Sequence, residues 1–146
     1  MDRKQNALDT HASGFNCAQS VFSALAEGTA VDRKTALRVS ACFGGGMRCG
    51  EVCGAVTGAL MALGVDSGFD DATDLAAKNA AAAKARAFNA AFRERQGTLI
   101  CRELLGDDPS TPEVFTRLKE SGTMGRVCNS AIADAVEIAE TLRARG

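Results

Sequence analysis

Apolar residues recur every three to four positions along most of the chain, which is the period of an α-helix. In the segment 3–27 this pattern is interrupted around Ser13 and Gly14, and its apolar face consists of Phe15, Ala18, Val21, Phe22 and Leu25. Asn16 is placed to cap the helix that follows the interruption, and Gly28 to end it. The pattern therefore predicts that the chain begins with helical structure.

The same period predicts further helices at residues 32–41, from about 50 to 64, and at 70–96, 98–106, 113–120 and 127–143. Asp32 is a suitable N-cap and Gly97 a suitable C-terminal stop for two of them. No segment shows the sustained alternation, rich in β-branched residues, that a strand requires. We therefore predict an all-α fold, a single-domain helical bundle of about five to seven helices spanning residues 1–146.

The stretch from Ala41 to Gly64 differs in amino-acid composition from the rest of the chain. Near its start are three consecutive glycines, Gly44 to Gly46, which are costly in a helix and predict a turn or a close approach to another backbone. The helix expected after it carries small residues on one face, namely Gly54, Ala55, Gly58, Ala59 and Ala62. Such a face lets a second helix come close. The apolar run is only about 14 residues, too short to cross a bilayer.

Composition narrows the functional classes. The chain has 146 residues, a net charge of −1 with dispersed basic residues, and no Trp or Tyr, so nucleic-acid binding is not expected. The N-terminal MDRKQNALDT lacks the apolar core of a signal peptide, which predicts a cytoplasmic protein. Thiols stay reduced in that compartment, so six cysteines point to metal binding or catalysis rather than to structural disulfides.

Four cysteines fall within about the first turn of a predicted helix: Cys17, Cys53, Cys101 and Cys128. The helix dipole stabilises a thiolate at such a position, which is how reactive and metal-binding cysteines are commonly produced. We therefore expect these four thiolates to be able to converge on one centre. Cys42, at the end of a predicted helix, is interpreted as structural.

Two other features bear on the chemistry. Cys49 and Cys53 are four residues apart, so if the helix begins early enough both thiols share one face and form a candidate catalytic pair that could also share a metal. His11 is the only histidine and lies in a polar stretch, so we interpret it as a solvated residue rather than a ligand.

The segment CGAVTG at residues 53–58, the preceding GGGMRCGE and the upstream NCAQ at residues 16–19 resemble a family of bacterial and archaeal redox-active proteins. That family is named for a C, GCAxxG, C, C cysteine pattern, and the resemblance covers nearly the whole chain. Its four cysteines correspond here to Cys17, Cys53, Cys101 and Cys128, whereas Cys42 and Cys49 lie outside the pattern. The resemblance implies a redox role, a prosthetic group such as an iron–sulfur cluster, and a redox partner protein or oxidoreductase.

Three functions remain open at this stage. In the first, the four cysteines bind an iron–sulfur cluster for electron transfer, or bind zinc in the same arrangement. In the second, no cofactor is bound and a thiolate, with Cys53 the leading candidate, exchanges with a partner's disulfide while a second cysteine resolves the mixed disulfide. In the third, the cysteines are inert packing residues of a helical interaction protein. Clustering of the cysteines in one place distinguishes the first two functions from the third.

Overall fold

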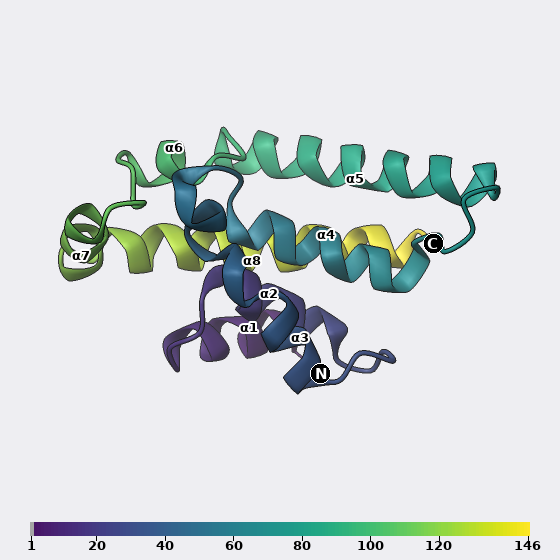
Figure 1. Ribbon diagram of the computed structural model, residues 1–146, viewed down its shortest axis with the longest axis horizontal. Coiled ribbons are helices and arrows are strands. Elements are labelled where there is room, and N and C mark those ends of the chain that lie inside the picture. The colour runs from purple at the N-terminus through teal and green to yellow at the C-terminus, as the bar shows by residue number, and fades with distance from the viewer. Residues whose placement is uncertain (1) are drawn as a thin grey trace.

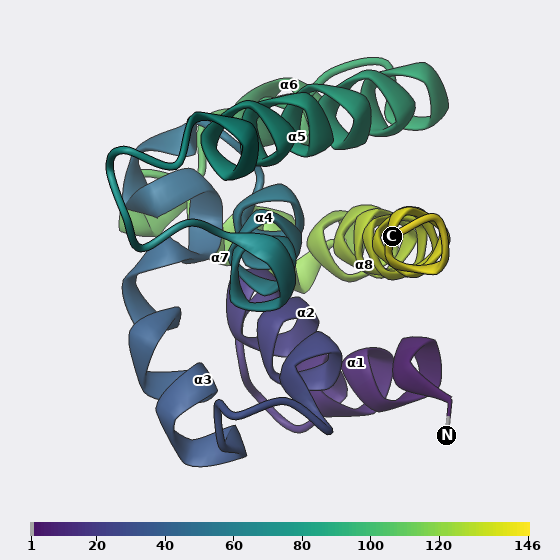
Figure 2. The ribbon, with the colours of Figure 1, turned by 90° about the vertical axis from the view of Figure 1, so that its right-hand side faces the viewer.

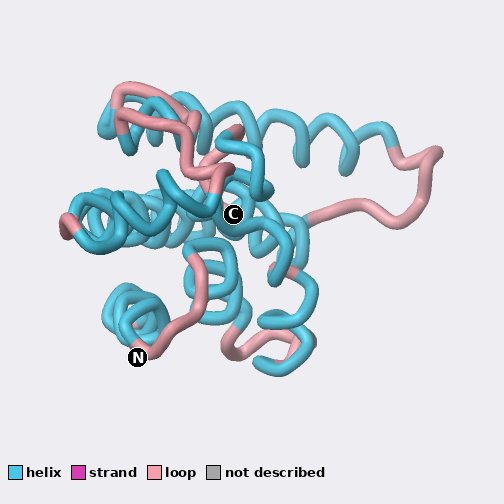
Figure 3. Tube along the Cα trace, turned by 60° about the vertical axis from the view of Figure 1, so that its left-hand side comes forward, coloured by secondary structure: helices cyan, strands magenta, loops and turns pink. Residues whose placement is uncertain are grey.

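The computed structural model describes residues 2–146, and this part of the chain is helical with no strands, as predicted. It contains the α-helices α1 (Arg3–Ala12), α2 (Cys17–Ala26), α3 (Arg33–Val39), α4 (Gly54–Ser67), α5 (Leu75–Gln96), α6 (Cys101–Leu105), α7 (Pro112–Glu120) and α8 (Thr123–Ala144). Two short helical turns, η1 (Ala41–Phe43) and η2 (Gly46–Gly50), lie between α3 and α4. Loops join the helices, the longest being the connection between α4 and α5 (Figure 3).

The helices form three layers (Figure 1). Helices α4 and α8 lie side by side in the middle, α5 covers one side of them, and α1, α2 and α3 cover the other (Figure 2). The core between the layers is built from buried residues of α2, α4 and α8, together with the stacked rings of Phe88 and Phe92 from α5. Burial of this apolar surface is the main stabilising term for the bundle.

Several helix starts are determined locally, as the sequence predicts. The Asn16 side chain accepts a hydrogen bond from the Gln19 backbone N–H, and the Gln19 side chain accepts one from the Asn16 N–H, which completes a capping box at α2. Asp32 caps α3 through the Thr35 N–H. Gly97 ends α5 with φ +88°, a left-handed conformation that favours glycine.

Helices α2 and α4 meet backbone to backbone. A Cβ atom added to Gly58 would lie 2.7 Å from the Ala18 carbonyl oxygen, and one added to Gly54 would lie 3.0 Å from the Ala18 nitrogen. No side chain larger than hydrogen fits at these points without movement. The small-residue face predicted for α4 is therefore confirmed, and it brings the start of α4 against the start of α2.

The predicted helix count is too low, because α1 and α2 are separate helices and the structure has eight α-helices within residues 2–146. Helix α5 begins at Leu75 rather than near Asp70, since Asp74 is the residue whose side chain caps it. Helix α8 begins at Thr123 rather than at Val127, because Gly122 alone adopts the left-handed φ of +81° and Gly125 lies inside the helix.

The glycine segment forms a turn, as predicted, but of an uncommon kind. Gly45, Gly46, Met47 and Arg48 all have φ between +60° and +63°, so they make one turn of left-handed helix before the chain becomes irregular at Cys49. Among residues 2–146, no helix combines the length and apolar character needed to span a bilayer.

Candidate functional site

The starts of α4 and α6 are joined by a short antiparallel bridge between Val52 and Ile100. The Cys53 N–H donates to the Leu99 carbonyl over 2.7 Å, and the Cys101 N–H donates to the Glu51 carbonyl over 2.6 Å. Cys101 lies opposite Glu51 in this bridge, and Glu51 is two positions before Cys53 on the same extended segment. Because such side chains point to the same side, those of Cys53 and Cys101 lie on one face of the bridge. Two cysteines from distant parts of the sequence are thereby placed together.

A second group of ligand atoms comes from α1, α2 and α8. His11 is in the last turn of α1, Cys17 is the first residue of α2, and Cys128 is in α8. One ligand atom from each of these three residues lies within 4.8 Å of the others, and His11 Nε2 is 4.0 Å from Cys17 Sγ. Imidazole nitrogen and thiolate sulfur are both ligands for Zn²⁺ and for other soft or borderline transition metals.

The two groups adjoin. Cys53 and Cys128 pack in the same apolar core as Cys17. A negative charge on any of these sulfur atoms raises the pKa of the neighbouring thiols. Charges on Cys53, Cys101 and Cys128 raise the pKa of Cys17. Charges on Cys53 and Cys128 raise the pKa of Cys101. We refer to Cys17, Cys53, Cys101 and Cys128 together as the cysteine centre. Cys17, Cys53 and Cys101 are buried, and Cys128 is half-buried.

Burial controls the protonation of two members of the cysteine centre. It raises the pKa of Cys53 to about 11, and burial together with the neighbouring Cys53 charge raises the pKa of Cys101 to about 12. The start of α4 does favour the Cys53 thiolate, since the N–H groups of Ala55 and Val56 lower its pKa, but burial outweighs this effect; at Cys101 the expected stabilisation is wrong, because every influence on its pKa raises it. The cost of removing a charged sulfur from water exceeds the stabilisation available from the helix dipole.

Cys17 and Cys128 behave as an unequal pair. Their hydrogen-bonding interaction lowers the pKa of Cys128 and, together with burial, raises the pKa of Cys17 well above its ordinary value. His11 adds a hydrogen bond and a favourable charge interaction that also lower the pKa of Cys128. Of the two thiols, Cys128 therefore has the lower pKa and loses its proton first.

The donor set of His11, Cys17 and Cys128 fits a metal ion that accepts sulfur and nitrogen ligands. Cys53 and Cys101 lie outside this group of ligand atoms, but near enough for a charge on either of them to act on Cys17. Thiolates select zinc, copper(I) and iron–sulfur clusters over hard cations, which prefer oxygen ligands. Gly46 lies directly beside Cys101, and Gly54 lies directly beside Cys17. Because neither glycine has a side chain, the backbone can approach both cysteines closely.

Cys42 and Cys49 are exposed free thiols, so neither is a buried packing residue. The Cys49 thiol donates to the Gly46 carbonyl over 3.4 Å. Cys49 and Cys53 do not share a helical face, because Gly50 is left-handed with φ +69° and α4 begins only at Gly54. The structure thus supplies no helical geometry for the pair expected from their spacing, and their assignment as catalytic residues stays a prediction.

Sequence reasoning missed the position of His11, which is half-buried beside Cys17 rather than free in solvent. The chain between them reverses direction through Ser13 and Gly14, and Gly14 has φ +118°. That turn brings the end of α1 back to the start of α2. Gly14 was the sequence signal that could have revealed this position of His11. A glycine between two helices indicates a tight turn, and a tight turn brings the end of the first helix close to the start of the second.

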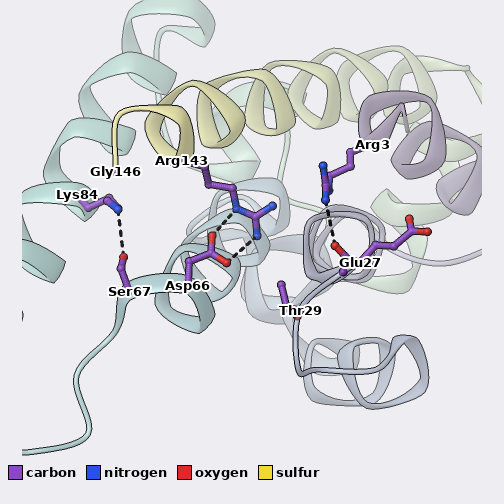
Figure 4. A pocket seen from close by; sticks show the side chains of 9 residues that line it. Arg3, Glu27, Thr29, Asp66, Ser67, Lys84, Arg143 and Gly146 are labelled. Carbon is purple, nitrogen blue, oxygen red and sulfur yellow. Dashed lines mark hydrogen bonds and ion pairs between the residues drawn. The ribbon is translucent and has the colours of Figure 1, made fainter.

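A separate cavity of about 430 Å³ is lined by charged residues of α1, α5 and α8 and by the C-terminal end of α4 (Figure 4). Its polar groups are largely paired with one another: Arg143 with Asp66, Lys84 with Ser67, and Arg3 with the Glu27 carbonyl. Helix α4 separates it from Cys53 by about 20 Å, the length of a 14-residue helix. The cavity is therefore distinct from the cysteine centre.

Comparison with known proteins identifies one family. A family model described as "Putative redox-active protein (C_GCAxxG_C_C)" matches residues 15–142, a range that includes the whole cysteine centre but not His11. No curated protein and no solved structure matches the chain.

Proposed function

The chain belongs to the redox-active protein family with the C_GCAxxG_C_C pattern, and we propose that it is a redox protein whose cysteine centre binds an iron–sulfur cluster or a single metal ion. The observation that carries this proposal is the group of His11, Cys17 and Cys128, whose ligand atoms lie within 4.8 Å of one another, with Cys53 and Cys101 near enough for their charges to act on Cys17. An inert packing role does not account for this grouping of ligand atoms.

Each ligand has a structural role in this proposal. Cys53 and Cys101 are held by the bridge between the starts of α4 and α6, and Cys17 by the capping box of α2. Cys53 and Cys101, whose thiols are kept protonated by burial, would hold the metal as thiolates, and the charge of the metal would compensate theirs. When bound, an iron–sulfur cluster supplies one-electron redox chemistry at a potential set by charge, hydrogen bonds and burial. The electrons would pass to and from a redox partner protein.

The direct test is the iron, zinc and acid-labile sulfide content of protein purified anaerobically, together with its visible spectrum. The chain has no Trp or Tyr, so absorption above 300 nm has few other sources. Iron with sulfide supports the cluster, and stoichiometric zinc without sulfide supports a single metal ion. Ser replacement of any one of Cys17, Cys53, Cys101 and Cys128 should lower the content severalfold, whereas Cys42→Ser and Cys49→Ser should leave it unchanged.

A second function, metal-free thiol–disulfide exchange, is favoured by one observation, the unequal pair Cys17 and Cys128. In this reaction the Cys128 thiolate attacks a disulfide of a partner protein, one partner sulfur leaves as a thiolate that takes a proton from water, and a mixed disulfide forms. The Cys17 thiol then loses its proton and attacks Cys128, which releases the second partner thiol. The protein ends with one disulfide, and the partner gains two electrons and two protons.

Metal analysis also separates these two functions. Protein that contains neither metal nor sulfide, and that loses two titratable thiols to a Cys17–Cys128 disulfide on mild oxidation, supports exchange chemistry. If the protein contains no metal and the same oxidation leaves all six thiols titratable, both functions are wrong.

A further inference from the structure

The left-handed turn at Gly45–Arg48 is unusual in its composition. Glycine adopts φ near +60° readily, but Met47 and Arg48 do so at a cost of about 1–2 kcal/mol each, because Cβ approaches the following carbonyl oxygen. Consecutive left-handed residues that are not glycine persist only where the surrounding structure imposes them. Here the two strained residues are followed by a third left-handed glycine, Gly50, with φ +69°.

The inner side of this turn lies against the cysteine centre. Gly46 is buried, and a Cβ atom added to it would lie 2.8 Å from Cys101 Cβ. The Gly46 carbonyl accepts the Glu51 N–H over 3.0 Å, which closes the turn next to the bridge that holds Cys53 and Cys101. On this side, the turn therefore places the Gly46 backbone directly against Cys101.

The outer side of the turn is open to solvent. Met47 is 38% exposed, and Arg48 and Cys49 are also exposed, so no packed side chains oppose outward movement of this side. The turn is held instead at its C-terminal end, where Arg102 donates to the Gly50 carbonyl over 3.1 Å and Gly50 packs against Asp108. Strain at Met47 and Arg48 is relieved when the segment before Gly50 leaves its left-handed conformation.

Cys101 is 9% exposed and Cys53 is 5% exposed, so access to them requires part of the structure to move. We propose that the turn Gly45–Gly50 is a strained gate over Cys101, and that its opening admits a metal ion or a thiol reagent to this residue. This proposal rests on the proposed function for its biological meaning, but its test depends only on the accessibility of Cys101.

The test is the alkylation rate of Cys101 by N-ethylmaleimide in reduced, metal-free protein, measured by peptide mass mapping with Cys17 as the internal reference. Met47→Gly removes strain from the closed turn and should slow alkylation of Cys101 relative to Cys17 by about fivefold, the equivalent of about 1 kcal/mol. Met47→Val adds a β-branched side chain at the same left-handed position and should accelerate it by a similar factor.

Leu75 provides the matched control, because it is also an exposed apolar residue but lies in the ordinary right-handed helix α5. Leu75→Gly and Leu75→Val should leave the ratio of the two alkylation rates unchanged. If the two Met47 variants also leave the ratio unchanged, or change both rates equally, Cys101 is reached by global unfolding and the gate is wrong. Absence of a bound metal would not affect this measurement, so the gate and the metal centre can fail separately.

Discussion

At Cys53, two influences act on the same sulfur atom. The position at a helix start favours the thiolate, and removal from water favours the thiol. The second influence dominates at Cys53 and is also the largest at Cys101, and their pKa values are raised to about 11 and about 12. In the metal-free protein these cysteines are therefore neutral at physiological pH, and metal binding at either one must release a proton.

The raised pKa values predict that the reduced, metal-free protein loses stability in alkali. Below the unfolded-state pKa, near 8.5, both states hold these protons. Above it, the unfolded chain loses them first, so each cysteine lowers the free energy of unfolding by at most about 1.4 kcal/mol per pH unit until its folded pKa is reached. Urea titrations at pH 8 and pH 10 under reductant measure this.

The matched control for the alkaline loss is Cys53→Ser with Cys101→Ser. Serine does not titrate in this range, so the double variant should show a smaller decline between the two pH values. An equal decline in both proteins would show that these thiols are not responsible for the loss.

At the scale of elements, α2 and α4 approach each other closely where Gly58 packs on the Ala18 carbonyl. Gly58→Ala places a methyl group 2.7 Å from that oxygen and should lower the free energy of unfolding by about 1–3 kcal/mol, because the two helices must separate. Gly64→Ala, in the same helix, meets no atom within 4 Å and should be neutral or stabilising by up to about 1 kcal/mol. Urea denaturation of the two variants checks both expectations.

The elements that sequence reasoning located correctly are those with local signals. Asn16 and Asp32 carry side chains that cap a helix whatever surrounds it, and the glycine face of α4 predicts close packing by size alone. The start of α8 was misplaced because Gly122 and Gly125 give the same local signal, and only the first of them ends up outside the helix.

The candidate site depended on information that local patterns do not hold. The sequence predicted which four cysteines could meet, but the half-buried position of His11 depends on how α1 packs on α2 and α8. The left-handed conformation of Met47 and Arg48 was unpredictable for a similar reason. Neither residue favours it, so tertiary contacts at Gly46 and Gly50 must impose it.

At the scale of the whole molecule, charged residues connect the three layers across α8. Glu137 of α8 pairs with Lys4 of α1 and with Arg95 of α5, each over 2.9 Å. These side chains are more than 40% exposed, so the pairs are partly screened by solvent. Glu137→Gln should therefore cost less than about 1 kcal/mol, and the difference from the original protein should shrink in 1 M salt. Thermal unfolding at low and high salt checks this, and a loss independent of salt would contradict it.

Helix α8 occupies the middle layer and contacts α1, α2, α4 and α5, yet it is the last helix of the chain (Figure 1). During synthesis the other helices leave the ribosome before the element that fills their shared interior. Until α8 arrives, the apolar faces of α2 and α4 lack a neighbour and the centre lacks Cys128. Folding of this bundle is thus expected to finish only after α8 has been synthesised, and a metal site that includes Cys128 can form only from that point.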